Sequence, residues 1–185
     1  IIQNATVGPS LGKQNIQKSG ISLLLGFVLV LGFMIFYYAK GGVVSVIALF
    51  LNVILIFGAL SSFGTVLTLP GIAGIVLTIG MAVDANVIIF ERIREELRDG
   101  KTTLAAIADG FKSSYSAIID ANVTTILTAI VLAYFGLGPI KGFAVVLIVG
   151  VISSLFTAVV VGKFFIDGYV DEGKRSMTFG TALTN

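Results

Sequence analysis

The chain has 185 residues, of which 56% are hydrophobic and 12% are charged, and its formal net charge is +2. Soluble domains contain about 25% charged residues, so this composition indicates a surface that faces lipid. The sequence has neither cysteine nor histidine, which excludes disulfides, thiol and imidazole catalysis and the usual zinc sites, and the small net charge does not indicate nucleic acid binding.

The first residues do not resemble a secretion signal. The chain begins Ile-Ile-Gln-Asn, with neither an initiator methionine nor a basic region followed by a cleavage site. We therefore interpret the sequence as a fragment of a longer protein.

Five apolar stretches follow, and each is long enough for a transmembrane helix, which needs about 20 residues. Polar or turn-forming residues at 61–65 and 136–139 separate stretches that would otherwise run together. We predict an all-α integral membrane protein, a bundle of five transmembrane helices with an amphipathic cytoplasmic segment. The predicted spans are 20–39, 43–62, 67–90, 118–136 and 140–166.

Basic residues predict the orientation of this bundle. Nine of the twelve Lys and Arg residues fall on one side of the predicted membrane and three on the other. Positive charge favours the cytoplasmic side. We therefore predict that segment 91–117 and tail 168–185 are cytoplasmic and that residues 1–18 are external.

The cytoplasmic segment 91–117 has two helical patterns. Residues 91–98 continue the third span as a charged helix, with Arg92 placed to pair with Glu96. Gly100 is a typical helix stop, and Thr102 or Thr103 can cap the next helix. That helix is amphipathic and is predicted to lie along the membrane surface or against the bundle, although a solvated connector fits the pattern too. Its apolar stripe comprises Leu104, Ile107, Ala108, Phe111, Tyr115 and Ile118.

Asp84 is the most informative residue, because it lies inside the third predicted span. A carboxylate within a bilayer costs roughly 2.5–3.5 kcal/mol, and such residues generally face a polar cavity or a partner. Burial also disfavours the charged form, so a carboxyl group in this position can bind and release protons. The alternative is a structural hydrogen bond to a neighbouring helix.

The surroundings of Asp84 recur later in the chain. The sequence Val-Asp-Ala-Asn-Val at 83–87 is repeated as Ile-Asp-Ala-Asn-Val at 119–123. The two spans run antiparallel, so Asp84, Asn86, Asp120 and Asn122 are predicted to form one polar cluster that relays protons. Asp120 lies nearer the interface, where it can instead reach water.

Small residues predict how the third span packs. Gly71, Gly74 and Gly80 would let another helix approach closely, and Pro70 can start the helix. Asn52 lies in the middle of the second span. It either reaches the Asp84 cluster or forms an interhelical hydrogen bond without a role in transport.

These motifs together are similar to those of the SecD family, a branch of the resistance–nodulation–division superfamily. The resemblance covers nearly the whole chain. It rests on segments 7–12, 71–78, 83–87, 91–97, 119–125 and 140–144.

The resemblance implies a role in protein export across the bacterial inner membrane. SecD proteins work with SecF, as a separate or fused chain, and assist the SecYEG translocon in moving preproteins. They draw on the proton gradient, or on sodium in some relatives. It implies that Asp84 is the proton-pathway carboxylate at the SecF interface, that the five spans are the second to sixth of six, and that residues 1–18 end an external domain.

Two other functions remain open from the sequence. One is a small-molecule exporter of the same superfamily, and the other is a scaffold that anchors a translocon without transport. No phosphate-binding loop of the form G-x-x-x-x-G-K-[ST] occurs. We therefore predict an ion-gradient-driven transport component, with no enzymatic activity, cofactor or metal of its own.

Overall fold

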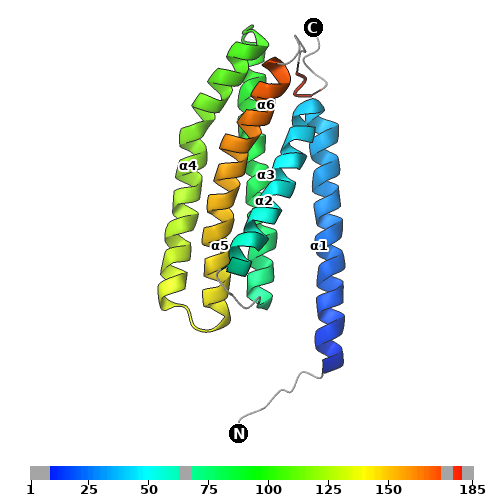
Figure 1. Cartoon of the computed structure of the whole chain (residues 1–185), viewed down its shortest axis with the longest axis vertical. Coiled ribbons are helices and arrows are strands. Elements are labelled where there is room, and N and C mark those ends of the chain that lie inside the picture. The colour runs from blue at the N-terminus through cyan, green and yellow to red at the C-terminus, as the bar shows by residue number, and fades with distance from the viewer. Residues whose placement is uncertain (1–8, 63–67, 172–176, 181–185) are drawn as a thin grey trace. The chain divides into compact units, whose positions relative to one another are not determined.

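The structure is a computed structural model that describes residues 9–62, 68–171 and 177–180. In those ranges all regular structure is helical (Figure 1), which confirms the predicted fold class. The elements are α1 (Pro9–Tyr38), α2 (Lys40–Ser62), α3 (Leu69–Arg98), α4 (Thr103–Phe135), α5 (Pro139–Leu155), the π-helix η1 (Phe156–Val161) and α6 (Gly162–Asp171).

The chain divides into two compact units, residues 1–33 and 34–185. The first contains most of α1, whose apolar side chains, among them Leu24, Leu25 and Leu29, are exposed. The second contains four stretches that are long and apolar enough to cross a membrane, Lys40–Ser62, Leu69–Arg98, Thr103–Phe135 and Pro139–Val170. Each of the five predicted spans therefore falls on a helix, the first of them on α1.

The predicted cytoplasmic segment 91–117 is almost entirely helical. α3 continues to Arg98, and Gly100 follows with a φ of +86°, a left-handed conformation that suits glycine. Thr102, rather than Thr103, caps α4 by accepting a hydrogen bond from the Ala105 amide at 3.4 Å. α4 then runs without a break to Phe135, so the amphipathic segment is the first part of the fourth span and not a separate surface helix.

The buried face of this segment differs from the predicted stripe. Ile107, Phe111 and Ile118 are buried, but Leu104 and Tyr115 are 63% and 54% exposed. The reason is that small residues face α3: a Cβ added to Gly110 would lie 2.4 Å from the Ile93 side chain. Because α3 and α4 come together at Gly110, Leu104 and Tyr115 point outward.

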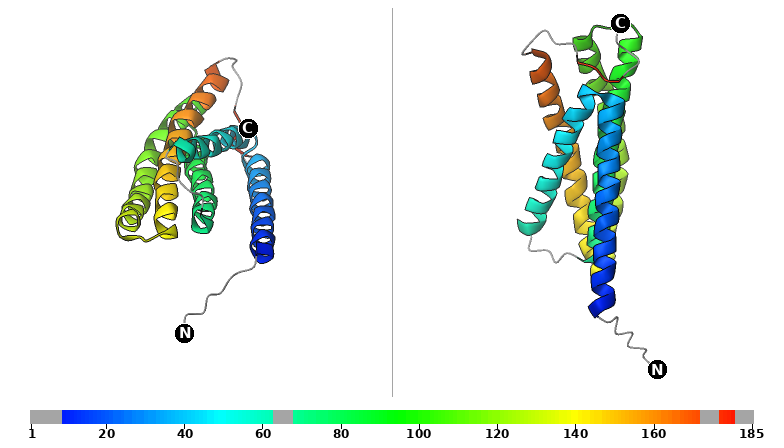
Figure 2. Two further views of the ribbon diagram at one scale, coloured as in Figure 1. Left: turned by 60° about the horizontal axis from the view of Figure 1, so that its bottom comes forward. Right: turned by 90° about the vertical axis from the view of Figure 1, so that its right-hand side faces the viewer.

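α3 packs against α2, α4 and α5, as Figures 1 and 2 show. Gly71 and Gly74 meet Val146 of α5 as predicted, whereas a Cβ added to Gly80 would meet nothing within 4 Å. The prediction of close packing at Gly80 is therefore wrong within this chain. Another close approach of α3 and α5 joins Thr78 to Gly150, where an added Cβ would lie 2.3 Å from the threonine methyl.

Pro70 lies in the first turn of α3, as predicted. Just before it, the Thr68 hydroxyl accepts a hydrogen bond from the Gly71 amide at 3.2 Å. Proline suits this position because its missing N–H would have no helical partner there.

The C-terminal end of α5 continues directly into η1. There the Gly162 amide donates to the Thr157 carbonyl, five residues back. The Thr157 hydroxyl donates to the Ser153 carbonyl at 3.0 Å.

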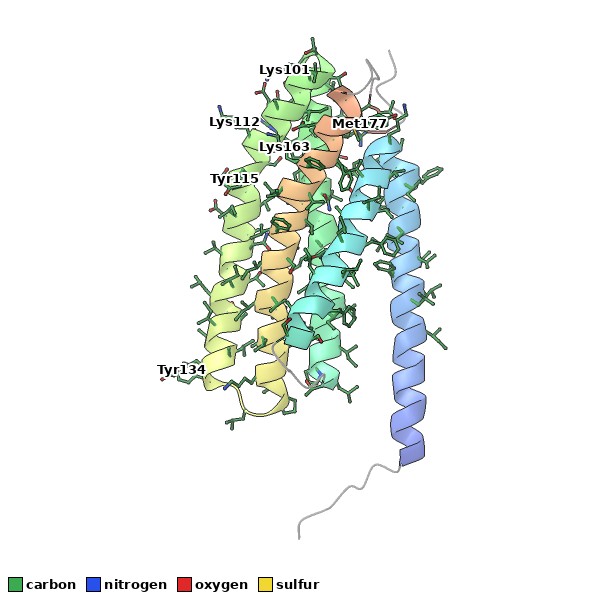
Figure 3. The ribbon with its side chains drawn as sticks, viewed as in Figure 1. Lys101, Lys112, Tyr115, Tyr134, Lys163 and Met177 are labelled. Carbon is green, nitrogen blue, oxygen red and sulfur yellow. The ribbon has the colours of Figure 1, made fainter. Side chains whose placement is uncertain are left out.

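Residues 177–180, within the predicted tail, pack against the bundle. Phe179 is buried and lies 5.5 Å from the Phe90 ring. The Gly41 amide donates to the Thr178 carbonyl at 3.2 Å. Figure 3 shows Met177 near the same end of the molecule as Lys101, and Tyr134 near the other. We call the end with Arg98 and Lys101 the charged end.

Candidate functional site

Asp84 lies near the middle of α3. It is the sixteenth of the thirty residues Leu69–Arg98, so at ~1.5 Å per residue it is roughly 22 Å from either end. Its side chain is exposed on the surface of this chain. Among the described residues, its carboxylate has no hydrogen-bond or ion-pair partner.

A small pocket of about 110 Å³ joins Asp84 to α4. Asn122 and Thr125 contribute the polar groups from α4, so the two repeated motifs do meet at this point. We call this space the Asp84 pocket. Its lining comprises Met81, Asp84, Ala85, Ile88, Ile118, Ala121, Asn122 and Thr125.

The other two residues of the predicted cluster lie elsewhere. Asn86 is buried, and a Cβ added to Gly162 would lie 3.8 Å from its Oδ1 atom. Asp120 is exposed and does not line the Asp84 pocket. The prediction of one cluster of four residues is therefore wrong. Residues two positions apart on a helix point in nearly opposite directions, so Asp84 and Asn86 cannot both face α4.

The two asparagines nevertheless share one local geometry. The Asn86 side-chain amide donates to the Ala82 carbonyl at 3.0 Å, and that of Asn122 to the Ile118 carbonyl at 2.7 Å. Each amide thus bonds to the carbonyl four residues earlier. The repeated motif encodes a local hydrogen bond in both helices, while only one of the two asparagines faces the pocket.

Asn52 is fully buried in α2, one helical turn from Ile56. Ile56 packs with Ile75 and Val146 in the core between α2, α3 and α5. Asn52 does not line the Asp84 pocket, and neither polar atom of its side chain has a hydrogen-bond partner in the described ranges. The predicted interhelical hydrogen bond is therefore not found there.

A larger groove of about 560 Å³ lies between α3 and α4 at the charged end. This groove was not predicted from the sequence, although the α3 residues that line it recur at three- and four-residue intervals. Arg92 forms an ion pair with Glu95, and its Nε lies 3.4 Å from Glu96 Oε1, as predicted. We call this space the charged groove. Its lining comprises Ile88, Glu91, Arg92, Glu95, Arg98, Ser113, Ser114 and Ala117.

Glu91 connects this groove to the rest of the bundle. It accepts hydrogen bonds from the Tyr38 hydroxyl at 3.1 Å and from Arg94 at 2.8 Å. The Arg94 guanidinium also lies over the Tyr37 ring, 5.0 Å from its centroid. These contacts fix one wall of the groove against the end of α1.

Lys101 joins the two helices beyond the groove. Its ammonium lies 2.6 Å from carboxylate oxygens of both Asp109 and Glu96. These hydrogen bonds, first that with Asp109 and then that with Glu96, raise the pKa of Lys101. The connection between α3 and α4 is therefore held by charge as well as by its short length.

Comparison with known proteins relates this arrangement to protein export. Residues 1–168 match the family described as protein export membrane protein SecD/SecF, C-terminal. The chain is 56% identical over 180 residues to the protein translocase subunit SecD of Rhodothermus marinus, covering 97% of this chain and 29% of that protein. It is 51% identical to the SecD subunit of Haemophilus influenzae, covering 86% and 26%.

Solved structures agree with these relatives. The crystal structure of SecDF, a translocon-associated membrane protein from Thermus thermophilus, superposes with a TM-score of 0.86 at 40% identity, over 96% of this chain and 24% of that one. A structure of SecDF in a super-membrane-facing form gives 0.82 at 40% identity, over 91% and 23%. The chain thus spans less than a third of the length of these relatives.

Proposed function

Because the chain belongs to the SecD/SecF family of protein export membrane proteins, we propose that it is the membrane-embedded part of a SecD-like accessory factor. In this role it uses an ion gradient to assist the export of polypeptides through the Sec translocon. A SecF chain, the translocon and the exported preprotein are its proposed partners. The charged end faces the cytoplasm in this proposal, since most basic residues lie there.

The exposed carboxylate of Asp84 at the middle of α3 supports this proposal most strongly. In contact with lipid it would cost roughly 2.5–3.5 kcal/mol, and the described part of this chain supplies no ion-pair partner for it. That cost is avoided if a second chain or a water-filled interface covers this face. We propose that a SecF chain covers it, which places Asp84 between two bundles that can move against each other.

Protonation would then couple the ion gradient to that movement. A neutral Asp84 removes a buried charge and can donate a hydrogen bond to the neighbouring amide or hydroxyl groups of Asn122 and Thr125. One charge moved through ~100 mV provides about 2.3 kcal/mol, and each pH unit of gradient adds about 1.4 kcal/mol. These energies are sufficient to shift the population of two packing arrangements. Sodium is the alternative coupling ion.

The repeated motif supplies a matched pair of variants for testing this function. Asp84→Asn and Asp120→Asn make the same chemical change in the same sequence context, but only Asp84 lines the pocket. In the full-length protein with its partners, we expect Asp84→Asn to abolish the gradient-dependent part of preprotein export into membrane vesicles. Asp120→Asn should preserve it, and both variants should insert normally.

Export that is equally gradient-dependent in the Asp84→Asn variant would refute the proposal. It would leave a scaffold that anchors the translocon. Loss of export with Asp120→Asn and not with Asp84→Asn would refute the assignment of the coupling residue.

A further inference from the structure

The Asp84 pocket and the charged groove are two parts of one furrow between α3 and α4. They share a single lining residue, Ile88. On α3 the lining runs from Met81 and Asp84 through Ile88 to Glu91 and Glu95, at three- and four-residue spacing, which places these residues on one face of the helix. Ile88 therefore lies between the carboxylate of Asp84, which is inside the predicted third span, and a groove lined with charges.

The helices are held together on both sides of this position. The Ser114 hydroxyl of α4 donates to the Ile88 carbonyl at 3.5 Å. One turn further along α4, Ile118 is 1% exposed. Because these contacts join the two helices here, the Ile88 side chain is the part of the furrow that can move with the least repacking.

Ile88 has the freedom that Ile118 lacks. Its side chain is only partly buried, whereas that of Ile118 is enclosed by its neighbours. β-Branching holds χ1 of a helical isoleucine near one rotamer, but χ2 of an incompletely packed isoleucine can change without repacking of the core. Ile88 is thus the movable side chain at the boundary between the two spaces.

We propose that Ile88 is a hydrophobic gate between the charged groove and the Asp84 pocket. A narrow apolar constriction excludes water and hydrated ions without blocking the path permanently. With the gate closed, the acid is separated from the water of the charged end. With the gate open, water extends to it along the furrow. The use of this path by the coupling ion rests on the proposed function, and the barrier rests on the proposed covering of this face, because Asp84 and Ala121 are exposed on this chain.

Cysteine accessibility measures this barrier directly, because the chain contains no cysteine of its own. Ala121 lines the Asp84 pocket, and Ser113 lines the charged groove. Ala121→Cys and Ser113→Cys are placed separately in the full-length protein, with its partners, in inverted and in right-side-out vesicles. Cysteines elsewhere in the full-length protein are replaced by serine. A charged, membrane-impermeant thiol reagent is then applied and the labelling rates are compared.

We expect Cys at 113 to react rapidly from the charged end in every background and Cys at 121 to react slowly. Ile88→Ala should accelerate labelling at 121 from that side by about tenfold or more, which corresponds to about 1.4 kcal/mol in the barrier. Ile88→Phe should slow it. Val87→Ala is the matched control, since Val87 is also partly buried on α3 but lines neither space, and it should leave the rate unchanged.

Equal labelling rates at 121 with Ile, Ala and Phe at position 88 would overturn the gate. The same conclusion follows if Val87→Ala accelerates labelling as strongly as Ile88→Ala. The use of Phe in parallel guards against a folding defect in the alanine variant, because the two substitutions are expected to act in opposite directions.

A second measurement separates this inference from the proposed function. We expect Ile88→Ala to increase gradient-driven proton uptake in the absence of preprotein, and the added change Asp84→Asn to remove that increase. If labelling at 121 depends on residue 88 while Asp84→Asn leaves export unchanged, the gate stands and the proposed function fails. If Asp84→Asn abolishes export while labelling is independent of residue 88, the proposed function stands and the gate fails.

Discussion

The contact between α3 and α5 at Thr78 and Gly150 allows a quantitative prediction for Gly150→Ala. The new Cβ would lie 2.3 Å from the methyl carbon and 2.5 Å from the Cβ of Thr78, which is fully buried. Overpacking of this kind costs about 1–3 kcal/mol. Replacing a helical glycine by alanine returns roughly 0.5–1 kcal/mol. Because both short distances involve atoms near the backbone, we expect a net loss of about 2 kcal/mol, near the upper part of the combined range.

For a unit of this size that unfolds by itself within the full-length protein, that loss should lower the melting temperature of the unit by about 4–8 °C. Fluorescence-detected size-exclusion chromatography after heating of the detergent-solubilised full-length protein measures it. Gly80→Ala is the control, since the same helix-propensity gain occurs where an added Cβ meets nothing within 4 Å. Its melting temperature should be unchanged or slightly higher.

A double-mutant cycle with Thr78→Ala tests the cause of the loss. Thr78→Ala removes the methyl and hydroxyl groups and leaves only the Cβ within 2.5 Å of the new atom. The Gly150→Ala penalty should therefore be smaller in the Thr78→Ala background. Strict additivity of the two changes, or an unaltered melting temperature for Gly150→Ala, would refute the reasoning.

Two further predictions concern the charged end. Phe179→Ala removes the packing against Phe90 and should release residues 177–180. The Gly41 amide should then exchange its hydrogen faster, as measured by mass spectrometry. Thr178→Ala should not change this exchange rate, because the acceptor of the Gly41 hydrogen bond is a backbone carbonyl. Lys101→Met should lower the melting temperature by removing the contacts with Asp109 and Glu96. Since the folded-state pKa of Lys101 is raised, the difference from wild type should be complete below about pH 10.4 wherever the partner carboxylates are ionised, and it should disappear as the pH rises through the folded-state value. A difference that closes near neutral pH would contradict this.

Local features of the fold were predictable because their causes are local. The continuation of α3 beyond the apolar span, its stop at Gly100 and the pairing of Arg92 with Glu96 each depend on residues within about one helical turn. The same holds for Pro70 at the start of α3. These signals do not depend on which helix lies next to which.

The partners of each helix face were harder to predict. The repeated Asp-Ala-Asn motif correctly indicated that α3 and α4 meet, but the rotation of each helix decides which motif residue faces the other. Gly110 and Gly150 set those rotations through contacts with Ile93 and Thr78, each far away in the sequence. Periodicity identifies an apolar stripe but not the small residues that bring two backbones together, and for this reason Leu104 and Tyr115 were misplaced.

The π-helix η1 determines how the end of the last span is rotated about its axis. Its Gly162 amide reaches the carbonyl five residues back, so this segment holds one residue more than the α-helical pattern needs. Removing one residue here would let the turn tighten with the later residues in place, whereas tightening it with every residue kept would turn everything beyond it by about 100°. Ile166, fully buried at present, would then rotate away from the core. The rotation of α6 about its axis is thus determined by a single extra peptide unit.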